Sequence, residues 1–203
     1  MKLFKPLFFG IIASLGALFL ELLLSLLLGS PEKLSRLFFS TVSPLLIATI
    51  LIEEFFKFIF IYKNFQQIEV RLKSSDEENK FKRADLLDSL LIGLGFSCLE
   101  LFFILLNLPE QSLHDLGLAI LGTVAIHILT AGVIGYLVVA ARKMSLAWAA
   151  KTLLIAFSLH FIYNYLIIYD FRPGAILLYL LALLLTLITM IIKIKSAPSR
   201  FVV

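Results

Sequence analysis

About six long apolar stretches run through the chain, separated by short polar segments. They lie near residues 6–28, 38–62, 85–108, 117–141, 146–169 and 173–194. Four or more of them reach the roughly 20 apolar residues that a helix needs to cross about 30 Å of hydrocarbon. Pro31, Pro109 and Pro173 stand at or near boundaries, where proline is best tolerated. The pattern predicts an all-α, polytopic transmembrane bundle of about six spans, in a single integral membrane domain over residues 1–203.

Composition agrees with this fold class. The chain is 61% hydrophobic and 16% charged, and its mean hydropathy is +1.01, far outside the range of soluble domains. Its single cysteine, Cys98, excludes an intramolecular disulfide and a cysteine-rich metal site. The formal net charge of +4 comes from basic residues that mostly flank the spans, so it orients the chain in the membrane rather than binding nucleic acid.

The basic residues are distributed unevenly between the two membrane faces. Most of them, including six in the segment 63–84, fall on one side, whereas the other side has only Lys33, Arg36 and Arg172. The positive-inside rule therefore predicts that both termini and the loop 63–84 are cytoplasmic. The apolar stretch 6–28 is longer than a signal-peptide core and no A-x-A-like site follows it, so we expect it to be retained as the first span.

Ionisable side chains interrupt four of the apolar stretches. They are Glu53, Glu54 and Lys57 in the second stretch, Glu100 in the third, His127 in the fourth and His160 in the fifth. Such residues cost about 2.5–3.5 kcal/mol each at the membrane centre, so they usually face the protein interior and mark a functional site. At 1.5 Å per residue, four of them lie roughly 14–22 Å from the cytoplasmic ends of their spans, namely Glu53, Glu100, His127 and His160. We expect them to converge on one polar site near the midplane.

The local spacing indicates what such a site could do. Two adjacent carboxylates, Glu53 and Glu54, suit general-base chemistry in a region of low dielectric constant, and Lys57 lies at the i+3 and i+4 positions that allow it to neutralise part of their charge. His160 and Asn164 share one helix face, where an imidazole and an amide could stabilise an oxyanion. These residues predict a hydrolytic centre.

Three other polar residues fit a structural role better. Glu21 has no local partner in the first stretch, Cys98 has no base at helical spacing, and His114 lies in a short outer loop. We expect Glu21 to be structural or interfacial, Cys98 to be inert and His114 to be solvated.

Four segments in order resemble the motifs of the PrsW-type intramembrane proteases. They are EEFFK at 53–57, DSLLIGLGFSCLE at 88–100, HILTAGVIG at 127–135 and HFIYN at 160–164. The resemblance covers about residues 50–165. One position departs from the family pattern, because Leu101 follows Glu100 where an asparagine is usual. The wider superfamily includes the type II CAAX prenyl endopeptidases and the non-catalytic Aph subunit of γ-secretase.

The resemblance implies hydrolysis of a peptide bond within or near the membrane, with specific roles for the motif residues. Glu53 would activate the water, while Glu54 and Lys57 would adjust its charge. Glu100 would position that water, and His127 would complete the polar cluster. His160 and Asn164 would stabilise the tetrahedral oxyanion.

Whether a metal takes part is left open by the sequence. Glu100, His127 and His160 are chemically acceptable zinc ligands with Glu53 as base, as in catalytic sites with three protein ligands and a water. No H-E-x-x-H motif places two ligands on one helical turn. The similarity to the glutamate-type CAAX endopeptidases favours water activated by glutamate, without a cofactor.

The resemblance also implies a partner and a location. The expected substrate is a membrane protein or peptide, such as a single-pass protein of the anti-sigma-factor type, and the expected location is the plasma membrane of a prokaryote. Two other functions fit a polar site in a membrane bundle, namely an Aph-like scaffold or chaperone and a proton-coupled transporter. The double glutamate together with H-x-x-x-N argues against a scaffold, and the chain shows no repeat of the kind found in transporters.

Overall fold

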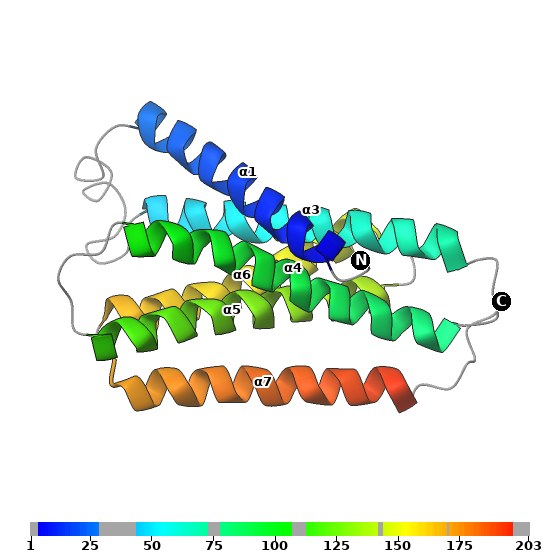
Figure 1. Ribbon diagram of the computed structural model, residues 1–203. Helices are drawn as coiled ribbons and strands as arrows, with labels where there is room; N and C mark the ends of the chain where they lie inside the picture. Colours follow the sequence, from blue (N-terminus) through cyan, green and yellow to red (C-terminus); the bar gives the residue numbers. More distant parts are fainter. Residues whose placement is uncertain are drawn as a thin grey trace.

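The computed structural model describes residues 4–28, 44–72, 78–106, 113–141, 144–169 and 171–196, and within these ranges all regular structure is helical. The six helices are α1 (Phe4–Leu28), α3 (Pro44–Leu72), α4 (Glu78–Leu106), α5 (Leu113–Ala140), α6 (Leu146–Ile168) and α7 (Pro173–Ser196), as Figure 1 shows. The predicted all-α bundle is therefore confirmed.

Helix boundaries follow local sequence signals. Pro44 and Pro173 each occupy the first position of a helix, where the missing N–H would have no partner in any case. The side chain of Ser145 caps α6 by accepting a hydrogen bond of 3.2 Å from the Trp148 N–H. These signals place the start of a helix at a defined residue.

The connection between α3 and α4 is shorter than the apolar pattern indicates. The predicted loop 63–84 is helical up to Leu72 and again from Glu78, and its residues 73–77 lie outside the described part of the chain. Gln, Glu, Lys and Arg in this segment are good helix formers even though they are too polar for a membrane. The helices thus continue beyond the residues that hydropathy marks as spans.

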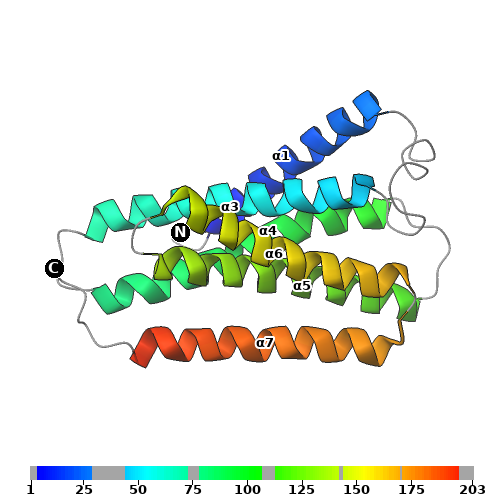
Figure 2. The same cartoon turned by 180° about the vertical axis from the view of Figure 1, so that it is seen from behind.

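The six helices are arranged around a central group of four. α5 packs against α3, α4 and α6, and α3 also packs against α4 and α6; α1 crosses α3 and α4, and α7 lies against α5 and α6 (Figures 1 and 2). Of the five most apolar helices, α5 is the most enclosed, with 61% of its apolar segment buried against 11% for α7. Side chains that face the centre come mainly from α3 to α6, and the site described below lies among them.

Five of these helices are long and apolar enough to cross a membrane, among the residues that the structure describes. α3 is the exception because Glu53, Glu54 and Lys57 interrupt its apolar part. It nevertheless contacts α1, α4, α5 and α6, so its polar residues are covered by neighbouring helices. The cytoplasmic location of the termini stays a prediction.

Glycines allow α4 to approach its neighbours closely. A Cβ at Gly10 would lie 2.8 Å from the Phe96 backbone nitrogen, and a Cβ at Gly93 would lie 2.5 Å from the carbonyl oxygen of His127. Small residues permit such backbone approach in membrane helix pairs. Gly93 therefore fixes α4 against the turn of α5 that carries His127.

Candidate active site

The ionisable residues of four helices meet in one buried cluster. α3 contributes Glu53, Glu54 and Lys57, α4 contributes Glu100, α5 contributes His127, and α6 contributes His160. Contacts given below link each of them to at least one other member. We call this group the polar cluster.

Lys57 is fully buried and uses all three of its donor positions. Its Nζ lies 2.5 Å from Glu54 Oε1, 3.0 Å from His127 Nδ1 and 3.1 Å from Thr130 Oγ1. An ammonium group has three protons and no lone pair, so it matches one carboxylate, one imidazole nitrogen and one hydroxyl. Lys57 is therefore held as a cation whose protons are all engaged.

His127 is held from both sides of its ring. Nδ1 of His127 lies 3.0 Å from Lys57 Nζ. Nε2, on the other side of the ring, contacts Oε2 of Glu100. The ring also lies 5.0 Å from the Phe96 ring, measured between centroids. These contacts fix the orientation of the ring.

His160 is oriented by the acidic pair. Its Nδ1 lies 2.7 Å from Glu54 Oε1 and 3.5 Å from Glu53 Oε2. A carboxylate accepts hydrogen bonds, so Nδ1 carries the proton and Nε2 keeps its lone pair. The His160 and His127 rings are 5.0 Å apart between centroids and nearly perpendicular, at 84°.

Burial distinguishes the two adjacent glutamates. The Glu54 side chain is 0% exposed, and its Oε1 accepts from both Lys57 and His160. Glu53 is 16% exposed, and its Oε2 accepts no hydrogen bond from any described residue. Oε2 of Glu54 also lacks a hydrogen bond from described residues, so the two side chains differ in the bonds to Oε1 of Glu54 and in the greater exposure of Glu53.

A metal ion fits three residues of the polar cluster. Ligand atoms of Glu53, His127 and His160 all lie within 4.8 Å of one another. The unused Oε2 of Glu53 and the free lone pair of His160 are the atoms that such an ion requires, and imidazole with carboxylate is a zinc-type donor set. The ligand set suggested by the sequence had Glu100 in place of Glu53; here Glu100 instead contacts the His127 ring.

The remaining candidates are not part of these contacts, although Glu21 lies near enough to Glu100 and Glu53 to interact with them electrostatically. Asn164 is half-buried and forms no hydrogen bond with any described residue. Cys98 is exposed, and the side chain of His114 lies outside the described part of the structure. Glu21 projects from α1 with its Oε1 buried and without a hydrogen bond from described residues.

Thr130 and Phe96 belong to the site but were not singled out by sequence reasoning. Thr130 is fully buried and supplies the third acceptor for Lys57. Phe96 stacks on His127 and lies 5.1 Å from Lys57 Nζ, close enough for a cation–π contact. Helical spacing could have identified both residues, because Thr130 lies three residues after His127 and Phe96 lies four residues before Glu100.

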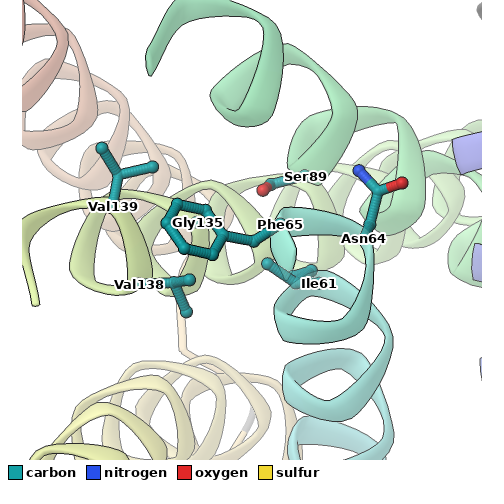
Figure 3. Close-up of a pocket in the computed structure, with 7 residues that line it drawn as sticks. All are labelled: Ile61, Asn64, Phe65, Ser89, Gly135, Val138 and Val139. Carbon is teal, nitrogen blue, oxygen red and sulfur yellow. The ribbon is translucent and has the colours of Figure 1, made fainter. Parts of the chain in front are cut away.

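A small hollow elsewhere in the bundle does not contain this chemistry. It lies between α3, α4 and α5 (Figure 3). Its lining residues are Ile61, Asn64, Phe65, Ser89, Gly135, Val138 and Val139. None of these seven is ionisable, so the polar cluster remains the candidate active site.

Comparison with known families decides the assignment. The sequence model described as "PrsW family intramembrane metalloprotease" matches residues 2–192. The chain belongs to the PrsW family. No curated protein and no solved structure matches it significantly. PrsW membership makes the chain an intramembrane protease, and therefore a hydrolase that acts on membrane proteins.

The family match also bears on the question of a metal. PrsW proteins are described as metalloproteases, and the polar cluster offers three suitable ligands. The sequence alone favoured water activated by glutamate without a cofactor. A metal ion therefore fits both the family description and the donor atoms of the polar cluster.

Proposed function

We propose that this chain is a zinc-dependent endopeptidase whose metal is held by Glu53, His127 and His160. The observation that carries the proposal is that ligand atoms of these three residues lie within 4.8 Å of one another. They come from three different helices, so their proximity arises from the packing of the bundle. Bound there, zinc would act as a Lewis acid toward the peptide carbonyl and make its water a stronger acid.

Glu100 is the residue best placed to take the proton from the attacking water. Its side chain is 31% exposed, more than those of Glu53 and Glu54. It contacts His127, one of the proposed ligands, and is not itself needed to hold the ion. A general base must reach both the water and the surroundings from which substrate enters.

Glu54 and Lys57 orient the ligands. Glu54 accepts from Nδ1 of His160 and leaves its Nε2 free, while Lys57 holds the opposite nitrogen of His127. Such partners fix ligand orientation, and their loss typically lowers metal affinity or activity by about 10–100-fold. Asn164, whose amide has no partner among described residues, is available to stabilise the oxyanion.

The proposed substrate is a single-pass membrane protein, such as one of the anti-sigma-factor type, cleaved in the plasma membrane of a prokaryote. A single helix can enter a bundle without unfolding a second span. The exposed apolar surfaces of the helices are consistent with entry from the lipid.

Cleavage in proteoliposomes tests the proposal. Wild-type protein would be incubated with a panel of single-span substrates, with and without a chelator, beside Glu53→Gln and Glu100→Gln variants. We expect chelation to stop cleavage and zinc to restore it. Glu53→Gln should lose both cleavage and bound zinc, measured by elemental analysis, whereas Glu100→Gln should lose cleavage but keep zinc.

Two outcomes would contradict parts of the proposal. Cleavage that resists chelation but disappears in Glu53→Gln would return Glu53 to the role of general base without a metal. The scaffold function would be favoured if the wild-type protein and both variants are folded and the wild-type protein cleaves no member of the panel.

A further inference from the structure

Glu21 is a carboxylate in the C-terminal half of α1 that the proposed mechanism does not use. Its Oε1 is buried and accepts no hydrogen bond from any described residue. No ion pair joins Glu21 to a cation in the described part of the chain. Leaving a buried carboxylate oxygen without a donor costs free energy, and a ligand that supplies the donor removes this cost.

The buried face of α1 directs Glu21 toward the polar cluster. Buried residues recur at intervals of three or four along this face, namely Pro6, Gly10, Ala13, Ser14 and Ala17. Ala13 and Ala17 pack in one apolar group with Phe96 of α4. Glu21 lies four residues after Ala17 and therefore on the same face of the helix.

Glu100 occupies the matching position on α4. It follows Phe96 by four residues, just as Glu21 follows Ala17, and α1 and α4 run in the same direction across their contact (Figure 1). One turn beyond the contact between Ala17 and Phe96, the two carboxylates therefore come to a similar level. Glu21 is accordingly near enough to Glu100 and to Glu53 to interact with both electrostatically.

The same part of α1 faces the surroundings of the bundle. After Ala17 no described side chain of α1 is buried, and this end of the helix diverges from α3 and α4 (Figures 1 and 2). Large apolar side chains are exposed here and at the C-terminal end of α4, among them Phe19, Leu22, Leu26, Phe102 and Leu106. A membrane segment that arrives from the lipid on this side therefore passes Glu21 on its way to Glu100.

The formal charges leave Glu21 as the carboxylate in excess. With zinc bound as proposed, the two positive charges of the ion and the one of Lys57 equal the negative charges of Glu53, Glu54 and Glu100. Glu21 adds a further negative charge that no described cation balances. The site is therefore complementary to a substrate that carries a positive charge.

We propose that Glu21 is a specificity-determining residue whose carboxylate binds a lysine or arginine side chain in the membrane segment of the substrate. Glu21 lies about 10 Å along the helix axis from Leu28, the last residue of α1. The long apolar stem of a basic side chain allows its charged group to lie at such a depth. The ion pair holds the substrate beside Glu100 and favours cleavage near the basic residue. This inference rests on the proposed function, because it names a feature of that substrate.

Cleavage of matched peptides in proteoliposomes tests this role. Each peptide has one leucine–alanine membrane segment, either without a charge or with a single lysine at successive positions along it. We expect wild-type protein to prefer one lysine position over the uncharged peptide by about tenfold or more in kcat/KM. In Glu21→Gln this preference should disappear, while bound zinc, measured by elemental analysis, stays at the wild-type level.

Further variants separate the effect of charge from that of helix packing. Glu21→Asp keeps the charge on a shorter side chain and should retain a preference for lysine. Glu21→Lys should instead prefer a peptide that carries glutamate at the same position. Leu22→Gln is the matched control, because it introduces the same amide at the next residue, which is exposed, and it should keep the wild-type preference.

The outcomes distinguish this inference from the proposed function. An equal lysine preference in wild type and Glu21→Gln, or no preference in wild type, would overturn the role of Glu21 and leave the metal site intact. If wild-type protein cleaves no peptide, the proposed function fails, and binding decides the role of Glu21. Energy transfer from Trp148, the single tryptophan, to a dansyl-labelled peptide would measure that binding. Tighter binding of the lysine peptide that is lost in Glu21→Gln supports the inference, and equal binding overturns it.

Discussion

Glu53 and Glu54 are neighbours in sequence but differ in what they contact. Successive residues on a helix point about 100° apart, and here Glu54 points toward Lys57 and His160 while Glu53 keeps a free oxygen. The motif named both residues correctly as a pair. It could not separate their roles, because the contact that separates them, between Glu54 and His160, comes from α6, 106 residues away along the chain.

This difference predicts that Glu54→Gln lowers the stability of the protein much more than Glu53→Gln does. Glu54→Gln removes the only carboxylate in contact with Lys57 among the described residues, leaving a buried cation without a countercharge, which typically costs about 3–5 kcal/mol. Glu53→Gln breaks no hydrogen bond to a described residue and should change stability little. Both variants should lose cleavage.

Unfolding titrations in detergent micelles would measure this difference. The free energies of unfolding of the two variants would be compared with that of wild type, in metal-free buffer so that ligand binding does not contribute. Equal losses in the two variants would show that Glu54 does not balance Lys57 as described.

At the scale of helices, the sequence predicted their number and approximate positions but not their neighbours. Apolar residues surround most of these helices, because lipid and protein interior both accept them, so periodicity does not reveal which face is buried. α1 illustrates this. Its contact with α4 depends on Gly10, and nothing in the sequence distinguishes Gly10 from the other small residues.

Gly10→Val should therefore disrupt the α1–α4 contact. A Cβ at this position would overlap the backbone of α4, where no side chain can move away, and overpacking typically costs about 1–3 kcal/mol. Gly174→Ala is the control, since nothing lies within 4 Å of a Cβ there. Thermal unfolding followed by size-exclusion chromatography would compare them, and equal stability would argue against close packing at Gly10.

At the scale of the whole molecule, the distribution of basic residues predicts how the chain is oriented in the membrane, and the arrangement of the helices does not test this prediction. Both termini and the α3–α4 connection are expected in the cytoplasm. The single native cysteine makes a labelling test simple. In a Cys98→Ser background, Ser75→Cys should react with an impermeant maleimide only after permeabilisation, whereas Ser112→Cys should react in intact cells.

The reverse labelling pattern would show that the molecule has the opposite orientation in the membrane. It would leave the polar cluster unchanged, because its depth is similar from either side, but it would change the face from which water and substrate arrive. Labelling of both positions in intact cells would indicate that one of the six helices does not span.

The saturated Lys57 ammonium has a consequence for biogenesis. The apolar part of α3 carries three ionisable residues, Glu53, Glu54 and Lys57, each costing about 2.5–3.5 kcal/mol on insertion. Partners of Lys57 and Glu54 in α5 and α6 follow 70 to 106 residues later. At about 5–20 residues per second, ribosomes complete those partners roughly 5–20 s after α3. During that interval the insertion machinery must hold α3 away from the lipid. A chain that stalls at this stage exposes a charged helix, which quality-control proteases could recognise.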